Sequence, residues 1–254
     1  QFNGPVAQGG DANDFRGAVG TIYKPSASVR QHFGDVISGL PRDNESTHSD
    51  NESKKIKALF LASNPKGTTT LELDREIRGV TEKIRASEYR DSLDLISAWA
   101  VRPDDLLQLL NQHKPQIVHF SGHGSKAGEI ILVDSHGSPK PVNPAALRAL
   151  FETLKDNIRL VILNACYSKK QAEAITQVID CAIGMNDAIG DEAAITFAAS
   201  FYRAIGFGRS IKQAFDQGIV ALLLEGIPEE NKPELLTRNE VDPDQIVLVA
   251  PEDE

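Results

Sequence analysis

Cysteine is scarce in this chain, with only Cys166 and Cys181 among 254 residues. A single pair cannot build a disulfide framework, and a structural zinc site needs more Cys and His at close spacing than the chain offers. No metal site and no cofactor are therefore expected, and a reducing cytoplasm is the simplest location. Cys181 lies in an apolar run and is expected to be a small buried core residue.

Basic residues are also few, with 27 Lys and Arg against 36 Asp and Glu, and the formal net charge is −9. Direct binding to nucleic acid or to an anionic membrane needs a basic surface, so neither partner is expected. No apolar stretch approaches the length that crosses a bilayer. The first residues lack the charged and apolar regions of a secretory signal, which agrees with a cytoplasmic protein.

The composition divides the chain into a short first segment and a longer domain. Residues 41–54 are polar, charged and almost free of apolar side chains, as in a flexible linker. Before them, Gly4–Gly20 is expected to be a hairpin or extended, and Val29–Leu40 fits one short amphipathic helix. We therefore expect a small N-terminal segment at residues 1–40 and a main domain at residues 55–254.

Apolar runs alternate with helical patterns throughout the main domain. The first predicted helix begins after a Thr70 cap and presents a stripe of Leu73, Ile77, Val80 and Ile84. Continuous apolar strands separated by helices indicate an α/β fold, with a mostly parallel sheet and helices on both faces. The predicted strands are 56–62, 93–101, 117–120, 129–133, 158–163 and 181–185, and the later helices are 103–110, 143–154, 171–179, 191–205 and 210–224.

Two of these strands end in reactive side chains. The segment VHFSGHG places His123 between two glycines, and VILNACYS places Cys166 after a small residue. Carboxyl ends of parallel strands share one edge of a sheet, so the imidazole and the thiol can meet there. A cysteine nucleophile needs such a His to keep it as thiolate, and the amides of Gly124 and Cys166 could form an oxyanion hole. His119, in the middle of its strand, is expected to pack in the core.

Four segments in order resemble the CHAT peptidase family, a caspase-like domain related to separases. The resemblance covers about Lys55 to Leu224 and implies a caspase-like fold and a cysteine endopeptidase. By this match Cys166 is the nucleophile, His123 is its proton-transfer partner, and the Gly124 and Cys166 amides are the oxyanion donors. The four segments are QIVHFSGHGS, EIILVD, RLVILNACYS and AIGMNDAIGDEAAITFAASFYRAIGFGRSIKQAFDQG.

The resemblance also places three residues in the substrate-binding pocket. Asn164, two residues before the nucleophile, occupies a position that is acidic in metacaspases, which cut after Arg or Lys. Asp187 and Asp191 lie where relatives carry acidic residues, and they could restore a negative pocket. Capping of the following helix is an equally good interpretation of Asp191.

Members of the family often act in bacterial defence, including antiviral defence, or in programmed cell death. The resemblance therefore implies a protein substrate, an activating sensor protein, and a docking or recruitment role for residues 1–40. Two other functions stay open at this point. One is a catalytically silent interaction module with the same fold. The other is a nucleotide-processing signalling domain, since KALFLAS followed by a loop and a helix is common in doubly wound folds.

Overall fold

A computed structural model describes residues 55–249 of the chain. The N-terminal segment at residues 1–40, with its predicted hairpin and helix, and the predicted linker at residues 41–54 lie outside the described residues.

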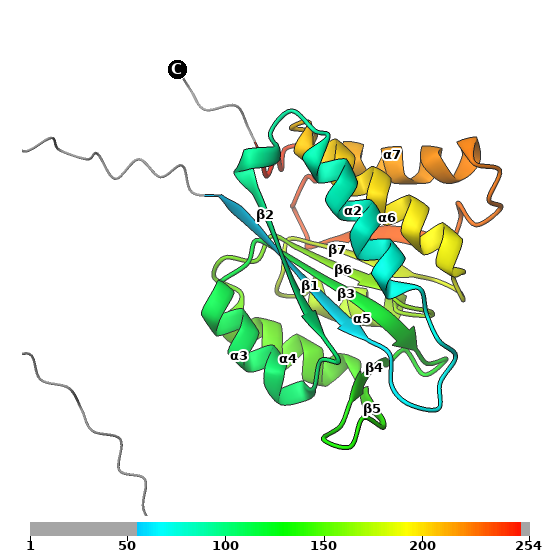
Figure 1. The fold of residues 1–254 in the computed structure, drawn as a ribbon. Coiled ribbons are helices and arrows are strands. Elements are labelled where there is room, and N and C mark those ends of the chain that lie inside the picture. The colour runs from blue at the N-terminus through cyan, green and yellow to red at the C-terminus, as the bar shows by residue number, and fades with distance from the viewer. Residues whose placement is uncertain (1–54, 250–254) are drawn as a thin grey trace, which may run out of the picture. The chain divides into compact units, whose positions relative to one another are not determined.

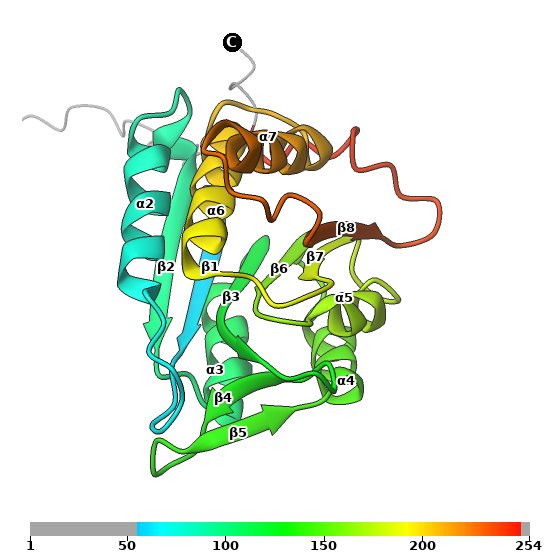
Figure 2. The same cartoon turned by 90° about the vertical axis from the view of Figure 1, so that its right-hand side faces the viewer.

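The core of the described chain is one mixed sheet with a mostly parallel arrangement. Every neighbouring pair along its main path is parallel except the last. A hairpin of β4 (Ile130–Val133) and β5 (Pro139–Val142) extends from the end of one central strand (Figure 2). In spatial order the main path contains β2 (Leu93–Trp99), β1 (Ile56–Ser63), β3 (Ile117–Gly124), β6 (Leu160–Asn164), β7 (Cys181–Met185) and β8 (Pro233–Thr237).

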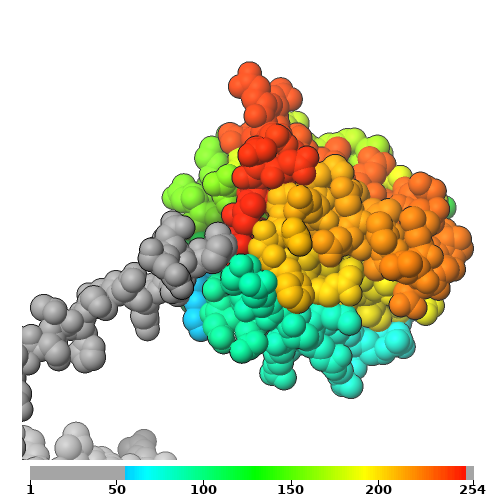
Figure 3. All heavy atoms as spheres, turned by 90° about the horizontal axis from the view of Figure 1, so that it is seen from above, coloured from blue at the N-terminus to red at the C-terminus, as the bar shows by residue number. Residues whose placement is uncertain are grey.

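Helices cover both faces of this sheet (Figure 1), which confirms the predicted α/β fold. The helices α2 (Leu73–Arg85), α6 (Asp191–Gly206) and α7 (Ile211–Leu224) share one apolar core with one face. From above they form one outer layer (Figure 3). The opposite face packs against α3 (Pro103–His113), α4 (Pro144–Leu154) and α5 (Lys169–Ile175). Within residues 55–249, none of the helices combines the length and apolar character that a membrane span requires.

Local sequence signals explain several of the helix starts. Asn143 Oδ1 accepts the Ala146 N–H at 2.9 Å at the start of α4, and a proline at the first helical position needs no hydrogen-bond acceptor there. The predicted Thr70 cap is wrong, because α2 begins at Leu73 after Glu72. The helix predicted for residues 171–179 is α5, which ends at Ile175. The strands β5 and β8 were not predicted.

The order of the strands reverses direction between β1 and β3. The strand β2 lies on one side of β1, and all later strands of the main path lie on the other side. In doubly wound sheets ligands bind at such a reversal, outside the carboxyl ends of the strands. The last two residues of β3 pair antiparallel with β4, His123 with Ile131 and Gly124 with Ile130. The end of β3 is therefore held at this edge of the sheet by its own hairpin.

Candidate active site

His123 is oriented by the loop that connects β1 to α2. Its Nε2 lies 2.9 Å from the Thr69 carbonyl oxygen and 3.3 Å from Asn64 Oδ1. A carbonyl oxygen only accepts hydrogen bonds, so Nε2 carries the proton and Nδ1 is the unprotonated nitrogen of the neutral ring. The imidazole is therefore held with Nδ1 free to accept a proton.

Gly124 brings the end of β3 into direct contact with the Cys166 backbone. A Cβ atom on Gly124 would lie 1.8 Å from the Cys166 carbonyl oxygen and 3.1 Å from its amide nitrogen. The Ser125 N–H donates to the Glu129 carbonyl at 2.9 Å. Hydrogen-bonded and non-hydrogen-bonded pairs alternate along an antiparallel ladder, so the preceding pair, Gly124 with Ile130, is a non-hydrogen-bonded pair. The Gly124 N–H therefore points away from β4 and is not used in that ladder.

Cys166 lies in a tight loop between β6 and α5. Its half-buried side chain places Sγ 3.8 Å from the Ile189 carbonyl oxygen. Tyr167 adopts a left-handed backbone with φ of 56°, and its N–H donates to the Asp187 carbonyl at 3.2 Å. The fully buried Ser168 hydroxyl then links the end of β6 to the end of β7, donating to one backbone carbonyl and accepting one amide. These contacts fix the backbone on both sides of the thiol.

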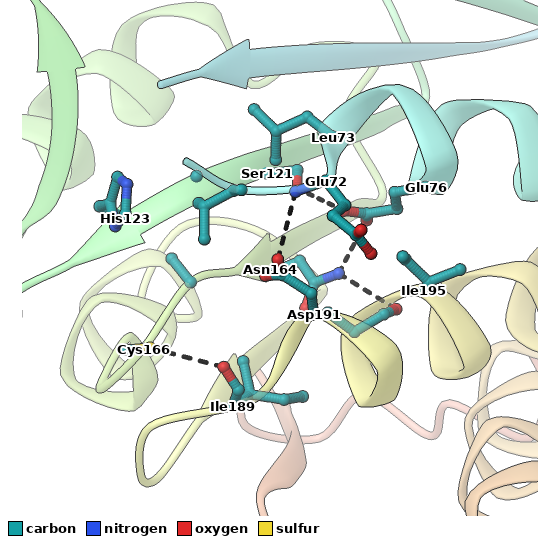
Figure 4. Close-up of a pocket in the computed structure, with 14 residues that line it drawn as sticks. Glu72, Leu73, Glu76, Ser121, His123, Asn164, Cys166, Ile189, Asp191 and Ile195 are labelled. Atoms are coloured by element: carbon teal, nitrogen blue, oxygen red, sulfur yellow. Dashed lines mark hydrogen bonds between the residues drawn. The ribbon is translucent and has the colours of Figure 1, made fainter. Parts of the chain in front are cut away.

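Cys166 and His123 line one pocket from the ends of two neighbouring strands (Figure 4). Figure 4 shows both on one side of the pocket, with Glu76 and Ile195 on the other side. Within the described chain no hydrogen bond joins the two side chains, since the thiol faces Ile189 and the imidazole faces Thr69. The structure thus brings the predicted pair to one pocket with the thiol and imidazole unpaired.

Cys181 differs chemically from Cys166. It is fully buried in β7. Burial, with a smaller contribution from the Asp180 carboxylate, raises the pKa of the Cys181 thiol to about 12. A thiol with so high a pKa stays protonated at neutral pH and is a poor nucleophile.

The three residues predicted for the substrate pocket occupy different places. Asn164 is buried, and together with Asp191 it lines the pocket that contains Cys166. Asp187 does not line this pocket. A hydrogen bond from the Ala188 N–H at 2.7 Å, and another from the Tyr167 hydroxyl, lower the pKa of the Asp187 carboxyl.

Asp191 is the first residue of α6, but it does not cap that helix. Gly190 is the N-cap of α6, without a side-chain hydrogen bond. The Asp191 carboxylate instead accepts the N–H of Glu72 at 3.2 Å and so contacts the start of α2. Of the two interpretations of Asp191, the capping one is wrong.

Glu76 is a pocket residue that sequence reasoning missed. It projects from α2 into the pocket and is only 2% exposed. On the buried face of α2 it lies between Leu73 and Val80, and the neighbouring Ile77 is only partly buried. The predicted stripe is present, with Ile77 packed at its edge against the core beside Leu73, and it also contains the carboxylate of Glu76, which was not predicted. Residues 73, 76, 80 and 84 have the spacing of one helix face, which could have indicated that Glu76 is buried. The adjacent Ile77 fits the same face and is apolar, so the pattern favours it instead.

Two buried donors from the sheet hold Glu76. The register of β3 and β6 places Ser121 opposite Asn164. The Ser121 hydroxyl donates to Glu76 Oε2, and Asn164 Nδ2 donates to Glu76 Oε1 at 2.7 Å. The wall of the pocket opposite His123 thus includes a buried carboxylate that accepts from two neutral donors and lies 3.2 Å from the buried His119 imidazole (Figure 4).

A family model described as the CHAT domain matches residues 24–232. A curated protein from an unknown prokaryotic organism, named Roc-COR-CHAT protease, is 27% identical over 206 residues, or 78% of this chain and 19% of that protein. A probable protease of Gillisia limnaea is 26% identical over 168 residues, or 65% of this chain and 30% of that protein. The chain thus spans less than a third of either relative.

The fold is also similar to that of a solved structure. The crystal structure of the Arg-specific cysteine proteinase gingipain R matches with a TM-score of 0.52, at 14% identity, over 75% of this chain and 47% of that one. At this identity the likeness concerns the fold alone, and it agrees with a caspase-like α/β arrangement.

Proposed function

Because the chain belongs to the CHAT domain family, we propose that it is a regulated cysteine endopeptidase that uses Cys166 and His123. The observation that carries the proposal is their position in one pocket at the carboxyl ends of β3 and β6, with Nδ1 of His123 left free. Both curated relatives are named proteases, which supports the same activity. Cys181 is not proposed to take part in the reaction.

The proposed reaction begins when the Cys166 side chain turns from Ile189 toward His123 as substrate binds. The contact of Sγ with the Ile189 carbonyl is weak, so this rotation meets little resistance. Sγ then attacks the carbonyl carbon of the scissile peptide bond while its proton passes to His123 Nδ1. The same proton is given to the leaving amine, and a thioester on Cys166 remains. Water, deprotonated by His123, hydrolyses the thioester and restores the thiol.

The amides of Gly124 and Cys166 are proposed to stabilise the oxyanion of the tetrahedral intermediate. The contact of their backbones places the two amides close together, and the Gly124 N–H is not used by β4. Two such fixed donors act in a site where water is partly excluded, which makes them effective. Asn164 and Asp191 are proposed to bind the substrate side chain that enters the pocket. Asp187 is proposed to act at its edge, through the Tyr167 loop.

Regulation is proposed because the thiol and the imidazole are unpaired in the structure. The matched segments make up only 19% and 30% of the two curated relatives, which supports control by further domains or by an activating sensor protein. By family resemblance, the pathway is proposed to be bacterial defence or cell death in the cytoplasm, with a protein as substrate. Residues 1–40 are proposed to help recruit a partner, although the family match already begins at residue 24.

A thiol-reactive peptide electrophile is expected to modify Cys166 and leave Cys181 free. With a pKa of about 12, only about one in ten thousand Cys181 thiols is ionised near pH 8. Cys166 is only half-buried and lines an open pocket, so it is accessible to the probe. Mass spectrometry of the digested chain would locate the adduct. Equal modification of both cysteines, or none with or without a partner, would favour a catalytically silent interaction module.

A further inference from the structure

The pocket next to Cys166 and His123 combines apolar walls with hydrogen-bond acceptors. Leu71, Leu73 and Ile189 contribute apolar surface. Glu76 and Asp191 contribute carboxylates, and among the described lining residues no Lys or Arg is present. A side chain that enters this pocket therefore meets both aliphatic surface and oxygen acceptors.

Glu76 is a buried carboxylate with no Lys or Arg partner among the described residues, and its one basic neighbour there is the buried imidazole of His119. Its two donors, the Ser121 hydroxyl and the Asn164 amide, are neutral. Nε2 of the buried His119 lies 3.2 Å from Glu76 Oε1, but neither ring nitrogen of His119 is in hydrogen-bonding geometry. Burial of a carboxylate is costly unless it is paired, so this site favours an incoming positive charge.

Asn164 adds a buried acceptor that, unlike Glu76, lacks a donor. Its Nδ2 faces two acceptors, Glu76 Oε1 at 2.7 Å and the Ala194 carbonyl at 3.3 Å, which determines the orientation of the amide. Its Oδ1 is then buried without a hydrogen-bond partner among the described residues, and the residue is only 4% exposed. An unsatisfied buried acceptor in a pocket wall calls for a donor from the ligand.

We propose that this pocket binds a lysine or arginine side chain of the substrate residue whose carbonyl Cys166 attacks, with Glu76 as the residue that determines this specificity. This inference rests on the proposed peptidase function. The aliphatic stem would pack on Leu71, Leu73 and Ile189, and the cationic end would donate to Glu76 and Asn164. An apolar residue would leave these acceptors desolvated, and an acidic one would be repelled by Glu76.

The test compares electrophilic peptides that differ only in the residue next to the reactive group: lysine, arginine, norleucine or aspartate. The full chain is incubated with each, and the rate of Cys166 modification is followed by mass spectrometry. Norleucine keeps the aliphatic stem of lysine and lacks its ammonium group. Lysine or arginine is expected to react at least about tenfold faster than norleucine, the size of one charge-assisted hydrogen bond.

Glu76→Gln is expected to remove most of this preference, because it keeps the shape of the side chain and removes its charge. Glu82→Gln, at an exposed position of the same helix, is the matched control and should keep the preference. Thermal unfolding shows whether Glu76→Gln folds, and Asp191→Asn offers a second variant at the pocket.

A wild-type chain that reacts with norleucine as fast as with lysine and arginine would overturn this inference alone. So would a folded Glu76→Gln variant with an unchanged preference. If no peptide modified Cys166, the peptidase proposal would fail, and this inference with it.

Discussion

Gly124→Ala is expected to reduce the reactivity of Cys166 toward a peptide electrophile by at least about a hundredfold. The added Cβ would lie 1.8 Å from the Cys166 carbonyl oxygen and 2.9 Å from its carbonyl carbon. Both are backbone atoms, so no side-chain rotation relieves the overlap, and the Cys166 loop or the end of β3 must move. A displacement of about 1 Å in a catalytic group commonly lowers a rate by about a hundredfold. The measurement is the rate of adduct formation.

Gly79→Ala is the matched control for this substitution. Its Cβ would be 3.7 Å from the side chains of Ile195 and Ala199, an ordinary contact distance. Alanine inside a helix is favoured over glycine by up to about 1 kcal/mol, so the thermal midpoint should stay the same or rise. The rate for Cys166 should be unchanged. If Gly124→Ala reacted like Gly79→Ala, the backbone contact would not be what positions the nucleophile.

His123→Ala is expected to slow the modification of Cys166 by about a hundredfold to ten-thousandfold, the usual contribution of a positioned acid or base. The reason is the loss of Nδ1, the atom left free by the bond from Nε2 to the Thr69 carbonyl. The partly exposed position of His123 means that the fold should survive. The pH dependence of the rate should also change, since a solvent-exposed base would have to replace the imidazole.

Two further substitutions make the His123 result specific. His136→Ala changes an exposed imidazole in the turn between β4 and β5 and should have no effect. Thr69→Ala should also have little effect, because the group that bonds His123 is a backbone carbonyl. An unchanged rate in His123→Ala, or an equal loss in His136→Ala, would contradict the role of His123 as proton acceptor.

Much of the fold could be predicted because its signals are local. Continuous apolar runs such as 56–62 and 181–185 indicate buried parallel strands, and the Asn143–Pro144 pair indicates a helix start. The general position of His123 and Cys166 follows from the same reasoning, since parallel strands end at one edge. The structure places both in one pocket there.

The remaining features of the site depend on contacts between distant segments. Glu76 becomes a pocket residue only because α2 packs over Ser121 and Asn164, which are 45 and 88 residues away. The bond that orients His123 comes from a backbone carbonyl, which any residue at position 69 would supply. The left-handed backbone conformation of Tyr167 could not be predicted from the sequence either, since a bulky residue is rarely expected at positive φ.

The most direct test of the peptidase account is the identification of new protein N-termini in cells that express the full chain or its Cys166→Ala variant. The activating partner, where its gene is known, is expressed in both. Because the Cys166 thiol is the proposed nucleophile of peptide-bond cleavage, a defined set of new N-termini should form with the wild-type chain and be absent with Cys166→Ala. The same set of N-termini with both chains, or none with either, would contradict it.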